Sequence, residues 1–115
     1  MNASTVVYRA KDGIARVVLN RPDQLNAISP ALLEDLDRVC ADVEGDPTVR
    51  AVTLTAAGRA FCAGADLKAV RLLSPDPEKW ARFMRLWHRV FNRIESLPVP
   101  VVAGVQGLEI GRAHV

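Results

Sequence analysis

Cysteine and histidine are scarce in this chain of 115 residues, which contains two of each. Cys40 and Cys62 lie far apart and form no Cys-x-x-Cys pair, so the sequence predicts reduced thiols rather than a disulfide framework. No Cys/His spacing typical of zinc ligands is present, and we therefore expect no metal site. The longest run without a charged residue, Ser96 to Leu108, has thirteen residues, whereas a membrane-spanning helix needs roughly 18 or more. We expect neither a disulfide-stapled miniprotein nor a transmembrane helix.

A strong excess of charge of one sign is also missing. The chain has 15 Lys and Arg against 13 Asp and Glu, and this net charge of +2 is too weak for a typical nucleic-acid binder. Residues 1–9 lack a basic segment followed by an apolar core, so we expect no secretory signal and a cytoplasmic protein. The apolar fraction is 50%, and Gly and Pro number seven each. This composition is typical of one globular domain, or part of one.

The order of apolar patterns predicts an α/β fold. Asp12-Gly13 between two β-branched runs predicts a hairpin. Ser29-Pro30 predicts a helix start, and apolar residues spaced three and four apart continue that helix to Gly45. A third strand follows this helix. The second strand, the helix and the third strand therefore form a βαβ unit with parallel pairing. The predicted strands lie at 5–9, 14–20, 49–55 and 101–105, and the predicted long helices at 29–45 and 78–97.

The second long helix has two different faces. Its apolar face contains Trp80 and Trp87, which we therefore assign to the core. We expect His88 to be a surface or boundary residue rather than a catalytic one. The opposite face carries the cationic residues Lys79, Arg82, Arg85, Arg89 and Arg93. Two interpretations of these cations stay open: a solvated helix face, or a surface that attracts a phosphate-bearing ligand.

The most informative local feature is the loop at 60–68, Ala-Phe-Cys-Ala-Gly-Ala-Asp-Leu-Lys. Small residues after a buried strand let the backbone approach a ligand closely, and Asp66 can cap a helix that begins at Leu67. Backbone N–H groups in such a loop can stabilise negative charge on a carbonyl oxygen. No histidine stands near Cys62 to increase its thiolate fraction, so we expect a packing residue rather than a nucleophile.

Three motifs in order resemble the enoyl-CoA hydratase/isomerase (crotonase) family. The first is Asn20-Arg21-Pro22 followed by Leu25-Asn26-Ala27, the second is the loop at 60–68, and the third runs from Pro98 to Gly107. The resemblance extends from about Tyr8 to Leu108. It implies a crotonase-like spiral fold of repeated ββα units, of which this chain holds the N-terminal part.

The resemblance also implies an acyl-CoA thioester substrate and an oxyanion hole of two backbone N–H groups that hold an enolate. Coenzyme A is then part of the substrate, no further cofactor is expected, and the full-length parent is a homotrimer or hexamer. Ala65 matches the residue that donates the first N–H. Leu25 matches a position near the bent chain of bound coenzyme A. Lys68 either meets a phosphate of coenzyme A or faces solvent. The positions that line the acyl-CoA pocket are matched by Ala63, Asp66, Leu67 and Lys68.

After Gly107 the sequence departs from the family pattern. The family continues with a Gly-Gly-Gly run and a catalytic glutamate, and a second catalytic glutamate follows later. Here Arg112 stands where the second oxyanion donor belongs, and Val115 stands where the first glutamate belongs. Glu109 is no substitute because it lies six residues too early. Both catalytic glutamates are therefore absent from this chain.

This departure predicts two unequal segments. We expect residues 1–108 to be the N-terminal part of a crotonase-like domain and residues 109–115 to be a non-native tail. Ile110 to Val115 resemble one translated frame of a common sequencing adapter, and the underlying nucleotides would test this. The alternative is a natural short protein with a divergent C-terminus.

The resemblance implies that the parent hydrates 2-enoyl-CoA in fatty acid oxidation and that the truncated chain is inactive. One alternative is another chemistry of the family, namely isomerisation, decarboxylation or thioester hydrolysis. The other is a non-catalytic module that binds a partner through its cationic helix. A steep salt dependence without preference for acyl-CoA would identify that module. We expect no binding to nucleic acid or membrane.

Overall fold

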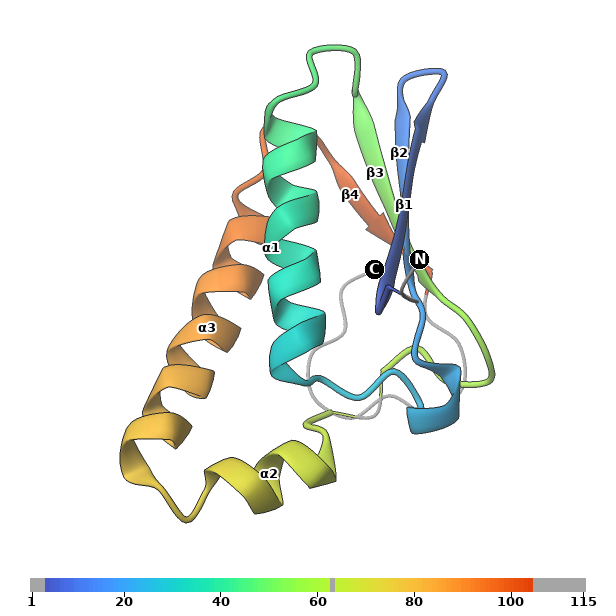
Figure 1. The fold of residues 1–115 in the computed structure, drawn as a ribbon. Coiled ribbons are helices and arrows are strands. Elements are labelled where there is room, and N and C mark those ends of the chain that lie inside the picture. The colour runs from blue at the N-terminus through green and yellow to red at the C-terminus, as the bar shows by residue number, and fades with distance from the viewer. Residues whose placement is uncertain (1–3, 63, 105–115) are drawn as a thin grey trace.

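The computed structural model describes residues 4–62 and 64–104 (Figure 1). The predicted strands and long helices are present, with described ends displaced by at most two residues. The elements in chain order are β1 (Val6–Lys11), β2 (Ile14–Leu19), the 3-10 helix η1 (Pro22–Gln24), α1 (Pro30–Glu44), β3 (Ala51–Ala56), α2 (Leu67–Leu73), α3 (Pro77–Glu95) and β4 (Val101–Ala103). The segment 105–115, which contains the predicted tail, lies outside the described residues.

The four described strands form one sheet in the order β1-β2-β3-β4. Strands β1 and β2 pair antiparallel, while β2 with β3 and β3 with β4 pair parallel. The tight turn between β1 and β2 places Asp12 at φ 55° and Gly13 at φ 81°, and positive φ at both central residues is what a type I′ hairpin turn requires. The predicted hairpin and βαβ unit are therefore confirmed.

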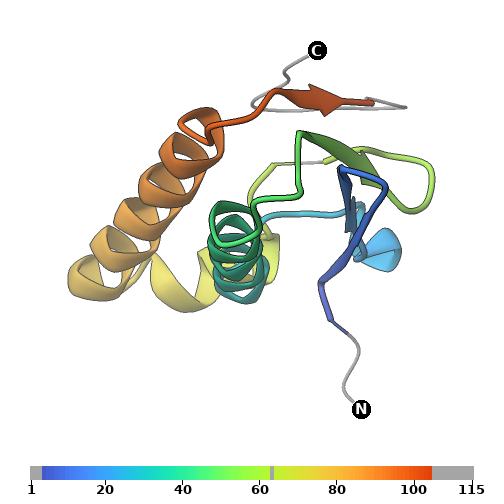
Figure 2. The same ribbon diagram turned by 90° about the horizontal axis from the view of Figure 1, so that it is seen from above.

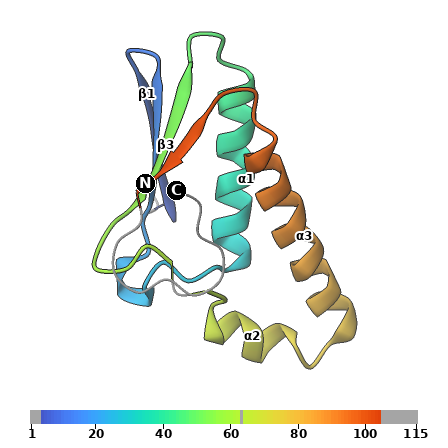
Figure 3. The same ribbon diagram turned by 180° about the vertical axis from the view of Figure 1, so that it is seen from behind.

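One face of this sheet is packed and the other is more open. Along β2, Ala15, Val17 and Leu19 are buried, whereas Arg16 between them is exposed. The parallel register places Leu54 beside Val17 on the packed face. Helices α1 and α3 both lie over this face, as the views from above and from behind show (Figures 2 and 3).

Helix α1 begins and ends as the sequence predicts. The Ser29 hydroxyl accepts a hydrogen bond from the Leu32 N–H (3.2 Å), and Pro30 occupies the first turn, where its missing N–H leaves no bond unmade. Gly45 ends the helix. Its buried face consists of Leu32, Leu33, Leu36, Cys40 and Val43.

Helix α3 is tied to α1 by arginines from the predicted cationic face. Arg93 donates to Asp37 Oδ1 (2.9 Å) and to Glu44 Oε2 (3.1 Å), and Arg89 pairs with Asp37 Oδ2 (3.1 Å). The cationic face is therefore not uniform, because its C-terminal arginines hold two helices together. Four of its cations, Lys79, Arg82, Arg85 and Arg89, are exposed, whereas Arg93 is half-buried.

The assignment of the tryptophans to the core is correct only in part. Trp80 and Trp87 are half-buried and pack against the core, each edge-on to the buried Phe83, with ring centroids 5.7 and 5.9 Å apart. Helical spacing identifies the apolar face correctly, but it cannot tell how completely that face is covered. His88 is exposed, which confirms its predicted surface position.

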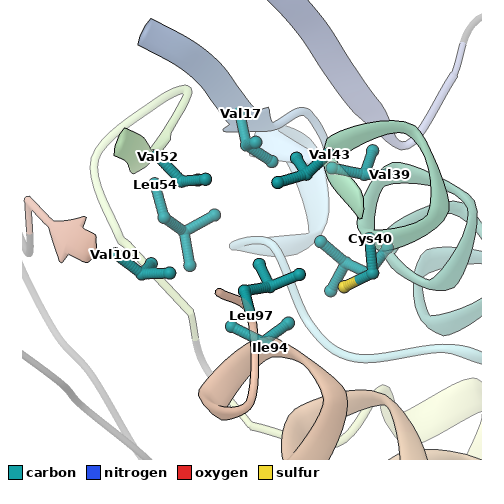
Figure 4. Close-up of a pocket in the computed structure, with 10 residues that line it drawn as sticks. Val17, Val39, Cys40, Val43, Val52, Leu54, Ile94, Leu97 and Val101 are labelled. Atoms are coloured by element: carbon teal, nitrogen blue, oxygen red, sulfur yellow. The ribbon is translucent and has the colours of Figure 1, made fainter. Parts of the chain in front are cut away.

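Cys40 and Cys62 are buried and form no disulfide among the described residues, in line with the predicted reduced thiols. Cys40 lines a small apolar gap of about 20 Å³ between α1, α3 and the sheet (Figure 4). Burial raises the pKa of Cys40 to about 11, so its thiol is protonated at neutral pH. A gap of this size without polar lining is a packing defect rather than a ligand site. No described helix is long and apolar enough to cross a membrane.

Candidate functional site

Two loops meet at the carboxyl ends of β2 and β3, the edge where parallel α/β sheets commonly bind ligands. One loop, residues 20–29, connects β2 to α1, and the other, residues 57–66, connects β3 to α2. The Ile28 N–H donates to the Gly64 carbonyl (2.7 Å), and the Asp66 N–H donates to the Ile28 carbonyl (2.9 Å). These two bonds form an isolated parallel bridge between Ile28 and Ala65. The predicted site loop is thus fixed against the segment that carries the first sequence motif.

The bridge determines which way the Ala65 amide points. In a parallel bridge of this kind the neighbours of Ala65 make both bonds, so the N–H and C=O of Ala65 itself point away from Ile28. No acceptor for the Ala65 N–H is found among the described residues, and Ala65 is exposed. Gly64 has φ 96°, a conformation that favours glycine at this position. The loop therefore presents one backbone donor that an external acceptor can use.

A buried asparagine holds the beginning of this loop. Asn26 is fully buried, and its Nδ2 donates to the carbonyls of Ala57 and Ala60, both at 2.8 Å. Its Oδ1 accepts from the Arg21 N–H (2.7 Å). The backbone of Asn26 has φ 53°, which asparagine tolerates better than most residues. Asn26 thereby satisfies backbone groups of both loops that would otherwise be buried without partners.

Asp66 caps helix α2 and binds Arg21 at the end of the loop. Its Oδ2 accepts from Arg21 (2.7 Å), and its Oδ1 accepts from the Ala69 N–H (3.1 Å) as the N-cap of α2. Burial by itself would raise the pKa of Asp66, but the hydrogen bonds from Arg21 and the Ala69 N–H outweigh it and hold the pKa below its usual range. Asp66 is therefore a charged cap and not a proton donor at neutral pH.

The other predicted site residues are spread around this junction. Leu25 is half-buried, with φ 53°, and lies next to Asn26. Leu67 and Lys68 are exposed in the first turn of α2, and Ala63 lies outside the described residues. Lys68 also lines an open depression of about 540 Å³ beside Asp66. The structure thus brings Ala65, Asp66, Leu67 and Lys68 together on one short stretch.

Arg21 and Asn26 belong to the first sequence motif, but the sequence alone indicates no role for either residue. Their partners are distant in sequence: Asn26 reaches residues 31 and 34 positions away, and Arg21 reaches 45 positions to Asp66. The sequence contained one indication of a turn at this point, because asparagine favours turns and Asn26 directly precedes the apolar residues Ala27 and Ile28. Among the described residues, no group of three or more His, Cys, Asp or Glu side chains is placed to hold a metal ion.

The fold of this chain matches solved structures of one class of proteins, the enoyl-CoA hydratases and isomerases. An enoyl-CoA hydratase from Bacillus anthracis matches with a TM-score of 0.83 at 33% identity, over 90% of this chain and 40% of that one. An enoyl-CoA hydratase/isomerase from Xanthobacter autotrophicus matches with a TM-score of 0.85, also at 33% identity, over 92% of this chain and 40% of that one. The crotonase-like α/β fold is therefore confirmed, for about two fifths of such a chain.

A sequence profile of the enoyl-CoA hydratase/isomerase family matches residues 9–114, and the chain belongs to this family. The short-chain-enoyl-CoA hydratase of Clostridium acetobutylicum is 36% identical over 112 residues, which are 96% of this chain and 42% of the relative. The 1,2-epoxyphenylacetyl-CoA isomerase of Escherichia coli is 33% identical over 108 residues, 92% of this chain and 41% of the relative. The chain spans about two fifths of the length of these relatives.

Proposed function

We propose that this chain is the acyl-CoA-binding part of an enzyme that stabilises a thioester enolate, and that the whole enzyme hydrates 2-enoyl-CoA. The observation that carries the proposal is the Ala65 N–H, which points out of the Ile28 bridge and has no acceptor among the described residues. An oxyanion that forms on a thioester oxygen needs donors of this kind at about 2.7–3.1 Å. The donor is held before the substrate arrives, so little reorganisation accompanies the reaction.

Hydration needs more than this donor. Water adds to the β-carbon of the enoyl group and a proton adds to the α-carbon, which is general acid–base chemistry. The family pattern assigns these steps to two glutamates and places a second N–H donor nearby, but the sequence has neither glutamate at the matching positions. We therefore propose that this chain binds acyl-CoA without turning it over, and that the whole protein is active as a homotrimer or hexamer.

The remaining predicted residues have roles in binding under this proposal. Lys68 is an exposed cation three residues after the donor, where it can meet a phosphate of coenzyme A. Leu25 and Leu67 offer apolar contact to the substrate, and the family pattern assigns Ala63, which lies outside the described residues, to the acyl-CoA pocket. Coenzyme A arrives as part of the substrate, and the proposal needs no other cofactor.

Isomerisation is the second candidate reaction. It is favoured by the membership of the chain in the enoyl-CoA hydratase/isomerase family, whose description includes both reactions. Both reactions use an enolate stabilised by the same donor, so they differ in the acid and base groups that act on the carbon atoms. Two assays separate them: loss of the conjugated enoyl-CoA absorbance reports hydration, and its gain from a 3-enoyl-CoA reports isomerisation.

The test compares the chain with a chimera in which residues 109–115 are replaced by the C-terminal part of an enoyl-CoA hydratase. We expect the chimera, but not the 115-residue chain, to hydrate crotonyl-CoA. Turnover by the short chain alone would mean that the assignment of the missing glutamates is wrong. A folded chimera that turns over neither a 2-enoyl-CoA nor a 3-enoyl-CoA would contradict the proposed function.

A further inference from the structure

One arginine binds the residues on both sides of the bridge that orients Ala65. Arg21 Nη2 donates to Asp66 Oδ2 at 2.7 Å, and Nη1 of the same guanidinium donates to the Ala27 carbonyl. Ala27 directly precedes Ile28, and Asp66 directly follows Ala65. The planar guanidinium therefore spans the two strands of the bridge from one side. A change in the distance between the loops must break at least one of these bonds.

The surroundings of Arg21 stabilise its hydrogen bonds to Asp66 and Ala27. The side chains of Arg21 and Asp66 are only 17% and 11% exposed, so water competes little for the bonds. The backbone of Arg21 is fixed as well, because its N–H donates to Asn26 Oδ1 (2.7 Å) and its carbonyl accepts from the Asn26 N–H (2.8 Å). Asn26 in turn holds Ala57 and Ala60 at the beginning of the site loop. Asn26 thus holds the beginning of the site loop, and Arg21 holds its end at Asp66.

The direction of the donor matters because a hydrogen bond weakens steeply as its N–H···O angle falls towards 120°. The angle at Ala65 is set by the peptide plane between Gly64 and Ala65, and the Ile28–Gly64 bond fixes one edge of that plane. Gly64 lacks a side chain and can rotate easily, so its orientation must come from its neighbours. Arg21 supplies the cross-link that keeps the neighbours in place.

We infer that Arg21 is a positioning residue for the oxyanion donor: through Ala27 and Asp66 it fixes the direction of the Ala65 N–H towards the thioester oxygen. This inference rests on the proposed function. Arg21 does not touch the reacting atoms in this role and acts through the loop alone. A lysine at this position would keep the charge, but its single ammonium group lacks the planar fork that holds Ala27 and Asp66 together.

The experiment uses the 115-residue chain and the variant Arg21→Lys, with Arg93→Lys as the matched control. Arg93 also makes several bonds to carboxylates, but it joins α1 to α3, away from the loop junction. The first readout, without ligand, is the NMR signal of the Ala65 amide and the hydrogen exchange of the Ile28 and Asp66 amides. The second is the carbonyl chemical shift of butyryl-CoA labelled with 13C at the thioester and bound at saturation.

In Arg21→Lys we expect the Ala65 signal to move and the Ile28 and Asp66 amides to exchange about tenfold faster, as a weakened local structure does. The carbonyl shift caused by binding should fall to less than about half of its original size, because a misdirected donor polarises the carbonyl less. Arg93→Lys should leave both readouts unchanged even if it lowers the global stability. A purely structural role for Arg21 would lower the stability without changing the carbonyl shift at saturation.

The outcomes separate this inference from the proposed function. Unchanged loop amides, or an unchanged carbonyl shift in Arg21→Lys, would overturn the inference. A carbonyl that does not shift on binding to the original chain would overturn the proposed function and the role of Arg21 towards the thioester, even if the amides showed that the loop depends on Arg21. If Arg21→Lys does not fold, Asp66→Asn replaces it, since the amide oxygen can still cap α2. We expect the same changes at smaller size, and their absence would again overturn the inference.

Discussion

Two arginines hold this chain together in different ways. Arg21 lies at the loop junction with its side chain 17% exposed and bonds to Asp66, which is 11% exposed. Arg93 joins α1 to α3 with its side chain 31% exposed and bonds to Asp37 and Glu44, which are 26% and 42% exposed. The first network orients a backbone donor, and the second strengthens a contact between helices that apolar side chains already pack. Similar ion pairs therefore have different consequences according to burial and to what the backbone needs from them.

Removal of the Arg21 side chain has the largest expected effect on stability. Arg21→Met keeps the length of the side chain but leaves the Asp66 carboxylate without its cation at a site with little water. We expect the free energy of unfolding to fall by about 3–5 kcal/mol, as for other broken buried pairs. Urea denaturation at neutral pH measures the change. A loss below about 1 kcal/mol would mean that this network is no more important than a surface pair.

The buried amide of Asn26 has the next largest expected effect. Asn26→Ala leaves the carbonyls of Ala57 and Ala60 and the N–H of Arg21 without their partners. We expect a loss of about 2–3 kcal/mol, because buried polar groups without partners cost about 1–3 kcal/mol each and water can enter part of the space. Asn26→Asp is the matched control: it keeps the acceptor for Arg21 but loses both donated bonds. Equal stability of Asn26→Asp and the original chain would contradict a holding role for these donors.

The Arg93 network should matter less. Arg93→Met removes the pairs with Asp37 and Glu44, but these groups are accessible to water after the change. We expect a loss of stability much smaller than that of Arg21→Met, measured by the same denaturation experiment. A loss as large as that of Arg21→Met would show that burial does not explain the difference between the two networks.

The fold was predictable to a larger extent than the site. The hairpin and the α1 cap at Ser29 depend on local residues, and the parallel pairing follows from the order of strand, helix and strand, so all three can be predicted from the sequence. The roles of Arg21 and Asn26 could not be derived in this way, because their partners are brought near only by the folded loops. The resemblance to a known family identified the loop that carries Ala65, whereas its orientation is a property of the three-dimensional bridge with Ile28. The roles of Leu25, Ala63 and Lys68 in binding stay predictions.

Acid should weaken the loop junction. The pKa of Asp66 is lower in the folded chain than its usual value, so its contribution to stability is present above about pH 4 and is lost as the pH falls through the folded pKa. Asp66→Asn has no such titration. We expect the stability difference between the original chain and Asp66→Asn to shrink between pH 6 and about pH 3. A difference that stays constant over this range would mean that Asp66 does not titrate with folding.

The smallest expected effect is that of salt on the coupling energies of the two ion pairs. Double-mutant cycles measure the coupling energy of Arg21 with Asp66 and of Arg93 with Glu44. We expect the second coupling to fall towards zero between low salt and about 1 M salt, because solvent-accessible charges are screened. The first should change little. Equal screening of both pairs would contradict the burial difference.

The most direct measurement of the central claim is made with Ala65→Pro, in which a ring carbon that cannot donate a hydrogen bond replaces the amide hydrogen of Ala65. Ala65→Pro has no N–H, whereas the matched variant Ala65→Val keeps it at similar size; neither change removes a bond of the Ile28 bridge, which Gly64 and Asp66 make. The bridge amides of Ile28 and Asp66 serve as the control that the loop is intact. In the chimera completed by a family C-terminal part, we expect crotonyl-CoA hydration by Ala65→Pro to fall about 100- to 1,000-fold in kcat, while Ala65→Val stays close to the original. Equal rates for Ala65→Pro and Ala65→Val, with the bridge amides intact, would contradict the account.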